Sequence, residues 1–215
     1  MVLSFVLVKF STIIIFLLTI PLAAFLTQSF FKSKIRSYMY WSIGMWFFSL
    51  GVFIEVLFAF GIYNAFLGNG YMLSVALIVE FLALGSINLI KNSSIKKAYY
   101  LFCIASTIFL VYSILISPNI PIINNARIAF TVTSLLVSIA SSIITFPAAA
   151  ILVIVAALSY KRTRNIKMLS IIAGVIVVSI AGGLYIEEIP VFLYYSEFVG
   201  ILLLWLGFFN FNRIR

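Results

Sequence analysis

Long apolar stretches separated by short polar turns constrain this chain more than any other feature. Hydrophobic residues make up 65% of the 215 residues and charged residues only 9%, whereas soluble domains carry about 25% charge. One helix that crosses a bilayer needs about 20 apolar residues. Seven such stretches and their turns use nearly the whole length, so the sequence predicts an all-α, polytopic membrane protein with seven transmembrane helices.

These helices are expected to form one membrane domain over residues 1–215, with no soluble domain. The first stretch is too long and uninterrupted for a cleaved signal peptide, so it counts as the first span. The connection SPNIPIINNAR after the fourth span has two prolines and three asparagines, which predicts a structured loop rather than a helix. The expected spans are Ser4–Phe30, Ser37–Tyr63, Tyr71–Ile90, Ala98–Ile116, Ile128–Tyr160, Ile166–Ile186 and Val191–Phe211.

The basic residues indicate an orientation. With the N-terminus outside, the inner turns contain twelve of the 14 lysines and arginines, and the outer side has only Lys9 and Arg127. Cytoplasmic loops carry such an excess of basic residues. We therefore expect a multi-pass protein of the cell membrane with its N-terminus outside and its C-terminus cytoplasmic. The twelve inner residues are Lys32, Lys34, Arg36, Lys91, Lys96, Lys97, Lys161, Arg162, Arg164, Lys167, Arg213 and Arg215.

Composition excludes several function classes. The net charge of +9 is spread over separate turns instead of forming one patch, so a nucleic-acid partner is not expected. The chain has no histidine and one cysteine, which argues against haem ligation and a thiolate zinc site. No cofactor is predicted. Histidine bases, aspartates and glycine-rich phosphate loops are absent from the sequence, so the chain is not expected to be an enzyme, and intramembrane carboxylate chemistry is the remaining catalytic alternative.

Three of the five acidic residues lie inside apolar stretches: Glu55, Glu80 and Glu197. A charged side chain at the centre of a span costs about 2.5–3.5 kcal/mol on insertion scales, so each is a candidate functional residue. Measured from the expected span ends, their depths are about 12, 15 and 10 Å. This predicts one layer in the outer half of the bilayer, where the three carboxyls share a proton or a cation. A carboxylate site of this kind could also hold Mg²⁺ or Ca²⁺.

The neighbours of the three glutamates suggest which way they face. Gly51 and Ala59 share a helical stripe with Glu55, and Gly200 follows Glu197 by three positions; small residues let helices approach closely. Glu80, as the deepest of the three, is expected to matter most. Lys9 enters from the same side at a similar depth and is a candidate ion-pair partner of Glu197, although it could equally extend to the membrane interface.

The fifth expected span has the clearest polar pattern. Hydroxyl residues recur in steps of three and four, which places them on one face of a helix. Such a face can line a polar cavity, and the alternative is that these hydroxyls bond their own backbone. The five positions are Thr131, Ser134, Ser138, Ser141 and Thr145.

Short similarities suggest an internal 3+1+3 parallel repeat. TIPLAAFL in the first span resembles TFPAAAIL in the fifth, and glutamate precedes phenylalanine in both the third and the seventh spans. A seven-span arrangement of this kind resembles small sugar-transporter bundles, and the span count alone is similar to sensor domains of bacterial kinases and to rhodopsins. The proline-glutamine motif, the kinase domain and the retinal lysine of these groups are absent, so no site residue follows from the resemblance.

Two functions remain open. The first is a small transporter or ion- or proton-coupled permease, in which the three glutamates bind a proton or cation. The second is a non-transporting membrane module, either a ligand-sensing domain or an accessory subunit of a larger complex. The expected partners are the lipid bilayer, a small-molecule or ion substrate, and a second copy or another membrane subunit.

Overall fold

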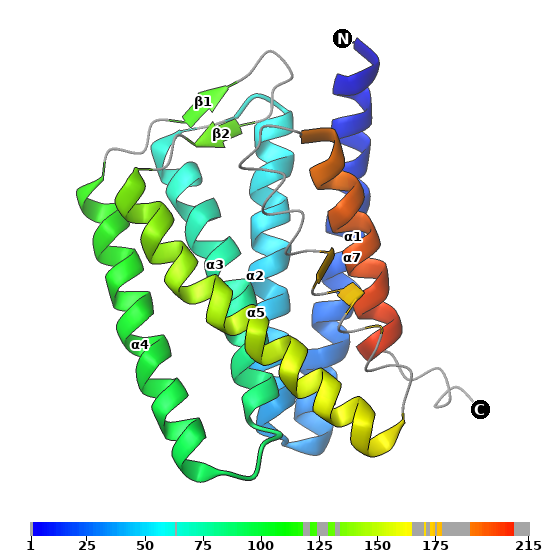
Figure 1. Ribbon diagram of the computed structural model, residues 1–215. Helices are drawn as coiled ribbons and strands as arrows, with labels where there is room; N and C mark the ends of the chain where they lie inside the picture. The colour runs from blue at the N-terminus through cyan, green and yellow to red at the C-terminus, as the bar shows by residue number, and fades with distance from the viewer. Residues whose placement is uncertain are drawn as a thin grey trace.

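The computed structural model describes residues 2–62, 64–117, 121–123, 129–131, 134–164, 170, 173–174, 176–177 and 190–208. In this part of the chain, six helices form an elongated bundle, with a small β-hairpin at one end (Figure 1). The helices are α1 (Val2–Ser33), α2 (Arg36–Ala59), α3 (Ala65–Ile87), α4 (Ser93–Ile116), α5 (Leu135–Thr163) and α7 (Pro190–Phe208).

Five helices, α1 to α5, are long and apolar enough to cross a membrane. This confirms the predicted apolar helical bundle and identifies the protein as one suited to a membrane. The seventh expected span corresponds to α7, whose apolar portion in the described residues is the shorter segment Tyr195–Gly207. The sixth, Ile166–Ile186, falls mostly outside the described residues. The count of seven spans, the orientation and the internal repeat therefore stay predictions.

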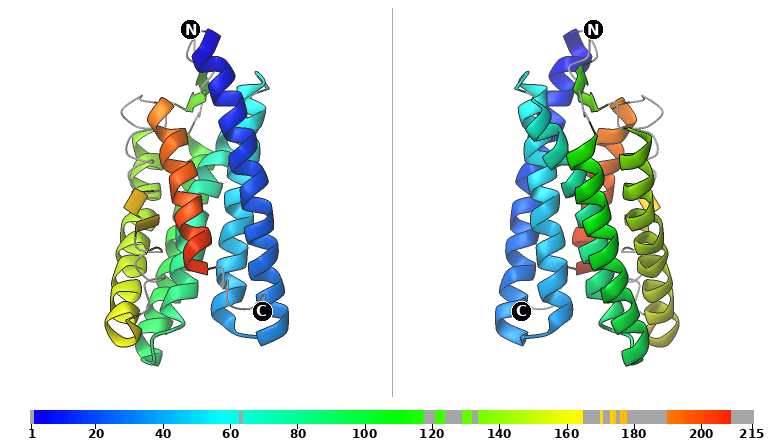
Figure 2. Two further views of the ribbon diagram at one scale, coloured as in Figure 1. Left: turned by 90° about the vertical axis from the view of Figure 1, so that its right-hand side faces the viewer. Right: turned by 90° about the vertical axis from the view of Figure 1, so that its left-hand side faces the viewer.

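Helices α2 and α3 form the centre of the bundle. In the apolar segments of α2 and α3, 61% and 67% of the residues are buried, against 33% in those of α1, α4 and α5. Helix α1 packs on α2, and α7 packs on α1. On the other side, α4 and α5 both contact α3 and each other, and the side views show α1 and α2 on one side of the bundle and α4 and α5 on the other (Figure 2). Among the five long helices of the described residues, α2 and α3 are the most buried.

Glycines allow α2 and α3 to approach closely. A Cβ on Gly44 would lie 3.2 Å from the carbonyl oxygen of Ile78, and one on Gly85 would overlap the indole of Trp41. In that position Trp41 Nε1 donates to the carbonyl oxygen of Leu82 at 3.1 Å. Buried indole N–H groups need such a partner. Close helix contact and a satisfied tryptophan therefore depend on the same small residue.

Asparagine and serine side chains start three of the helices. Asn64 accepts from the backbone N–H of Leu67 at 2.8 Å and begins α3, Asn92 begins α4 and Ser134 begins α5. These are favoured N-cap residues because their side chains satisfy N–H groups that have no partner inside the helix. The structure corrects two expected boundaries: α2 ends at Ala59 instead of Tyr63, and α3 begins at Ala65, after the Asn64 cap, instead of at Tyr71.

The connection between α4 and α5 contains two short antiparallel strands. Strand β1 (Pro121–Ile123) pairs with β2 (Ala129–Thr131), with Pro121 opposite Thr131. The expected structured loop is thus a β-hairpin in its described part, and β2 also contacts α2. The fifth span starts at Leu135 instead of Ile128, because β2 occupies Ala129–Thr131 and Ser134 caps the helix.

Two tight turns lie together at the opposite end of the bundle from this hairpin (Figure 1). Lys34 ends α1 with φ 55°, in the left-handed region, and α2 begins at Arg36. The turn between α3 and α4 is also short, ending at the Asn92 cap. The beginnings of α2 and α4 are therefore neighbours at this end.

Candidate functional site

Glu55 and Glu197 form a buried carboxyl pair. The side chains of α2 and α7 contact each other through these two groups, and the hydroxyl of Tyr71 donates to Glu55 Oε1 at 2.6 Å. In the described part of the chain, Oε2 of each glutamate is buried with no N–H or O–H donor. Ionised carboxylates only accept hydrogen bonds. Two of them in contact therefore need at least one proton between them.

The helix connections explain how this pair is assembled. Glu55 lies in the last turns of α2, and the short link to α3 brings Tyr71 back beside it. Glu197 comes from far away in the sequence, and it reaches Glu55 because α7 packs on α1. Trp205 Nε1 donates to the carbonyl oxygen of Leu18 at 3.0 Å, which ties the two helices. That contact sets the height of Glu197 along the bundle.

Glu80 belongs to a second, separate cluster between α3 and α4. Thr107 Oγ1 lies 3.0 Å from Oε1 and 2.8 Å from Oε2 of Glu80. The thiol of Cys103 also contacts the Glu80 carboxyl. The hydroxyl of Tyr99 lies beside that thiol, but in the described residues its geometry gives no hydrogen bond. Both oxygens of Glu80 are thus engaged by a neighbouring helix.

The packing of α2 against α3 shows that the three glutamates do not share one layer. Gly70 faces Ile54, so Glu55 lies at the level of residues 70–71 of α3. At the other end, Gly44 faces Ile78 and Leu82, which places Glu80 near Gly44. Ten residues of α3 separate the two levels, which is about 15 Å.

The expected single layer is therefore wrong, and its error lies in the helix boundaries. The expected depths of Glu55 and Glu80 start from Tyr63 and Tyr71, whereas α2 ends at Ala59 and α3 begins at Ala65. Glu55 is consequently closer to its helix end than expected. Glu80 is farther from its own, near the middle of the bundle. Glu80 is not part of the pair, and its predicted greater depth in the bilayer stays a prediction.

The expected hydroxyl stripe is divided between three structural settings. Thr131 lies in β2, outside the helix. Ser134 caps α5, accepting from the N–H of Val137 and donating to Ser117 Oγ at 2.8 Å. The other three positions lie within α5 and are half-buried, beside the fully buried face of that helix: Ser138, Ser141 and Thr145. Their role as a cavity lining stays a prediction.

Lys9 places its ammonium group over an aromatic ring. Its Nζ lies 4.5 Å from the ring centroid of Phe60, a cation–π distance. Lys9 is thus near the same end of the bundle as the carboxyl pair, and its predicted pairing with Glu197 stays a prediction. The contact that the structure gives Glu197 is with Glu55.

The two clusters differ in what they could bind. In the described residues, no three histidine, cysteine, aspartate or glutamate side chains gather into a metal-binding group. The carboxyl pair offers two carboxyl groups, whereas Ca²⁺ takes about 6–8 oxygen ligands. A proton needs only the two oxygens that face each other. The arrangement therefore suits proton binding better than metal binding.

Three contributing residues were missed by sequence reasoning. Tyr71, Thr107 and Cys103 are ordinary apolar or weakly polar residues in predicted spans. A short link between spans makes Tyr71 a foreseeable neighbour of Glu55, since antiparallel helices pair residues equally far from their turn. No comparable signal marks Thr107, because its helix position relative to Glu80 depends on packing.

Comparison with protein-family models, with curated proteins and with solved structures gives no match. The class of the protein therefore rests on its own features, which are those of an apolar helical membrane bundle with carboxyl groups buried between its helices.

Proposed function

We propose that the protein is a small membrane carrier that couples movement of a solute or ion to protons, with Glu55 and Glu197 as its proton site. The observation that carries this proposal is the carboxyl pair, in which each Oε2 is buried without an N–H or O–H donor in the described residues. Ionisable groups in spans are rare and mark proton relays and substrate paths. A proton at this pair would change the contact between α2 and α7, because the two carboxyl groups face each other there.

The proton would act on the packing of α7. With one proton, the two carboxyl groups attract each other and hold α7 beside α2. Without it, two like charges face each other in an apolar interior, and they repel. A ligand that biases one of two arrangements shifts the population of both. Protonation of the pair would therefore couple to the position of α7.

In this proposal Ser138, Ser141 and Thr145 line the route of a small polar or ionic substrate. The carrier spans the cell membrane with its N-terminus outside, as the distribution of basic residues favours. Glu80 has a structural role, because Thr107 already engages both of its oxygens.

The test uses purified protein in liposomes adsorbed to a solid-supported membrane. Pulses of Na⁺, K⁺, a sugar mixture and an amino-acid mixture are applied with and without an inward pH gradient. We expect one pulse class to displace charge in a way that depends on the gradient. Glu55→Gln and Glu197→Gln should each abolish that dependence, and Glu80→Gln, the matched control, should retain it. Full gradient dependence in both pair variants would contradict the proposal.

A non-transporting membrane module is the second candidate. The observation in its favour is the hydrogen bond between Thr107 and Glu80. A glutamate with a purely structural role needs such a partner on a neighbouring helix. In that case no pulse evokes a pH-dependent signal from folded protein. All three glutamine variants would then change only the thermal stability.

A further inference from the structure

A pocket of about 460 Å³ opens at the end of the bundle that carries the α1–α2 and α3–α4 turns. It lies far from the carboxyl pair, at the other end of α2. Four of its lining residues are basic: Arg36, Lys91, Lys96 and Lys97. None of the five glutamates of the chain belongs to residues 31–37 or 88–100. All charged side chains among its described lining residues are therefore positive.

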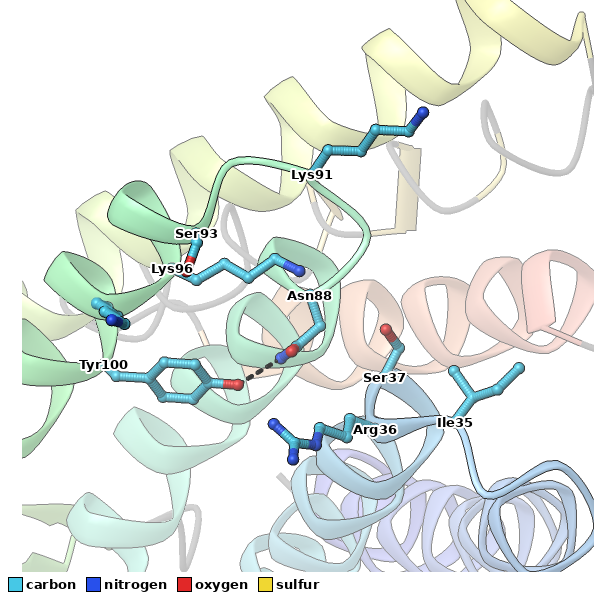
Figure 3. A pocket seen from close by; sticks show the side chains of 9 residues that line it. Ile35, Arg36, Ser37, Asn88, Lys91, Ser93, Lys96 and Tyr100 are labelled. Carbon is cyan, nitrogen blue, oxygen red and sulfur yellow. Dashed lines mark hydrogen bonds between the residues drawn. The ribbon is translucent and has the colours of Figure 1, made fainter.

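Neutral hydrogen-bonding groups line the same space. They are Ser37, Asn88, Ser93 and Tyr100, and Asn88 Nδ2 donates to Tyr100 Oη at 2.6 Å. In Figure 3, Lys96 reaches from α4 toward Asn88, and Arg36 extends from α2 toward the side on which Tyr100 lies. Lys91 points away from this pair of neutral groups. The two convergent cations are thus Arg36 and Lys96.

The helices add to the positive potential. Both α2 and α4 begin at the pocket, at Arg36 and Ser93, and a helix N-terminus carries about half a positive charge. The N-cap of α2, Ile35, makes no side-chain cap bond. The first N–H groups of a helix have no partner within it, and they are the groups that bind anions at helix N-termini.

We propose that this pocket binds a phosphate group, held by Arg36 and Lys96 above the N-terminus of α2. Arginine and lysine side chains that converge in one pocket repel each other, and a phosphate offsets that repulsion. The planar guanidinium of Arg36 suits two phosphate oxygens at once, and the ammonium of Lys96 acts as a compact charge. Ser37 and Tyr100 supply hydroxyl groups beside these cations.

The same phosphate chemistry has two sources. An anionic phospholipid can present its headgroup at the membrane surface, and basic pockets between membrane helices bind such headgroups. A soluble phosphate compound can enter from the aqueous side. The test separates them by offering delipidated protein in non-ionic detergent either inorganic phosphate or phosphatidylglycerol, with phosphatidylcholine as the zwitterionic reference. Binding is measured by isothermal titration for phosphate and by native mass spectrometry for the lipids.

We expect the wild-type protein to bind phosphate, or to retain phosphatidylglycerol in preference to phosphatidylcholine. The first outcome assigns a soluble ligand, and the second alone assigns a lipid. The double variant Arg36→Gln and Lys96→Gln should weaken the observed binding by about tenfold or more. The charge-matched control is Lys161→Gln with Arg162→Gln, which removes two exposed cations at the end of α5, outside the pocket.

Two results would overturn the proposal. One is a wild-type protein that neither binds phosphate nor prefers phosphatidylglycerol. The other is an equal loss of binding in the control, which would mean that diffuse surface charge attracts the ligand. Arg36 is exposed, so its replacement by glutamine should not prevent folding. The two binding measurements on the wild-type protein do not depend on any variant. The carrier activity of the carboxyl pair is not needed for this test, so either proposal can fail alone.

Discussion

The hydroxyl of Tyr71 donates a 2.6 Å hydrogen bond to Oε1 of Glu55. This bond joins the beginning of α3 to the end of α2, at the level where Glu197 arrives from α7. It supplies one donor to a carboxyl group that lies 6% exposed. The Glu197 carboxyl group contacts the same Glu55 carboxyl group from α7.

Tyr71→Phe should destabilise the protein by about 1–2 kcal/mol, because it leaves a buried acceptor without its donor. The measurement is thermal unfolding of the purified protein in detergent. Tyr112→Phe is the matched control, since Tyr112 is 58% exposed on the outer face of α4, and it should leave the midpoint unchanged. Equal midpoints for wild type and Tyr71→Phe would mean that the hydrogen bond contributes nothing.

Thr107→Val should destabilise the protein more than Thr107→Ser. Valine has the shape of threonine but no hydroxyl, so Glu80 loses the donor that engages both oxygens, at a cost of about 1–3 kcal/mol. Serine keeps the hydroxyl and loses only a methyl group. Chemical unfolding followed by tryptophan fluorescence compares the two. If the serine variant is the less stable, methyl packing between α3 and α4 is what matters there.

Gly85→Ala should be among the most damaging single-methyl additions in the described helices. The added Cβ would overlap the indole of Trp41, and overpacking of this kind costs about 1–3 kcal/mol. Gly70→Ala is the control: its nearest atom is Ile54 Cδ1 at 3.6 Å, and alanine gains up to about 1 kcal/mol of helix propensity. Thermal midpoints should therefore move in opposite directions. A stable Gly85→Ala variant would show that Trp41 has room to turn aside.

Cys103 should react with a maleimide only after unfolding. It is the one cysteine of the chain, 5% exposed, and it lies between Tyr99 and Glu80. A buried thiol without positive neighbours is unreactive. Mass spectrometry would show slow labelling of the native protein and complete labelling in detergent with denaturant. Rapid native labelling would instead reveal frequent separation of α3 and α4.

Much of the fold was predictable from local sequence. The apolar stretches predicted the helices α1 to α5, and the clusters of asparagine, serine and glycine predicted where the turns lie. Proline and asparagine also excluded a helix between α4 and α5, where β1 and β2 form. Helix ends were less accurate, because an apolar residue such as Ile62 fits both a span and a turn. Asn64, two residues later, caps α3. This role is visible only from its hydrogen bond with the backbone N–H of Leu67.

The candidate site was predictable only in its components. All three glutamates are buried, as their positions in apolar helices suggested. Their grouping was not predictable, because it depends on how far α3 slides along α2. Contacts of Trp41 with Gly85, and of Gly70 with Ile54, set that register. A shift of one helical turn moves a residue by about 5.4 Å, which is enough to make or separate a carboxyl pair.

The sequence by itself determined the class of the protein, because burying this much apolar surface requires helices suited to a membrane. It also determined that carboxyl groups lie among those helices and that basic residues gather at their turns. Only the tertiary structure decided that Glu55 pairs with Glu197, that Glu80 stands apart with Thr107, and that Arg36 and Lys96 face one pocket. The physical reason is that hydrophobicity is a property of each segment, whereas side-chain contact depends on the register and rotation of packed helices.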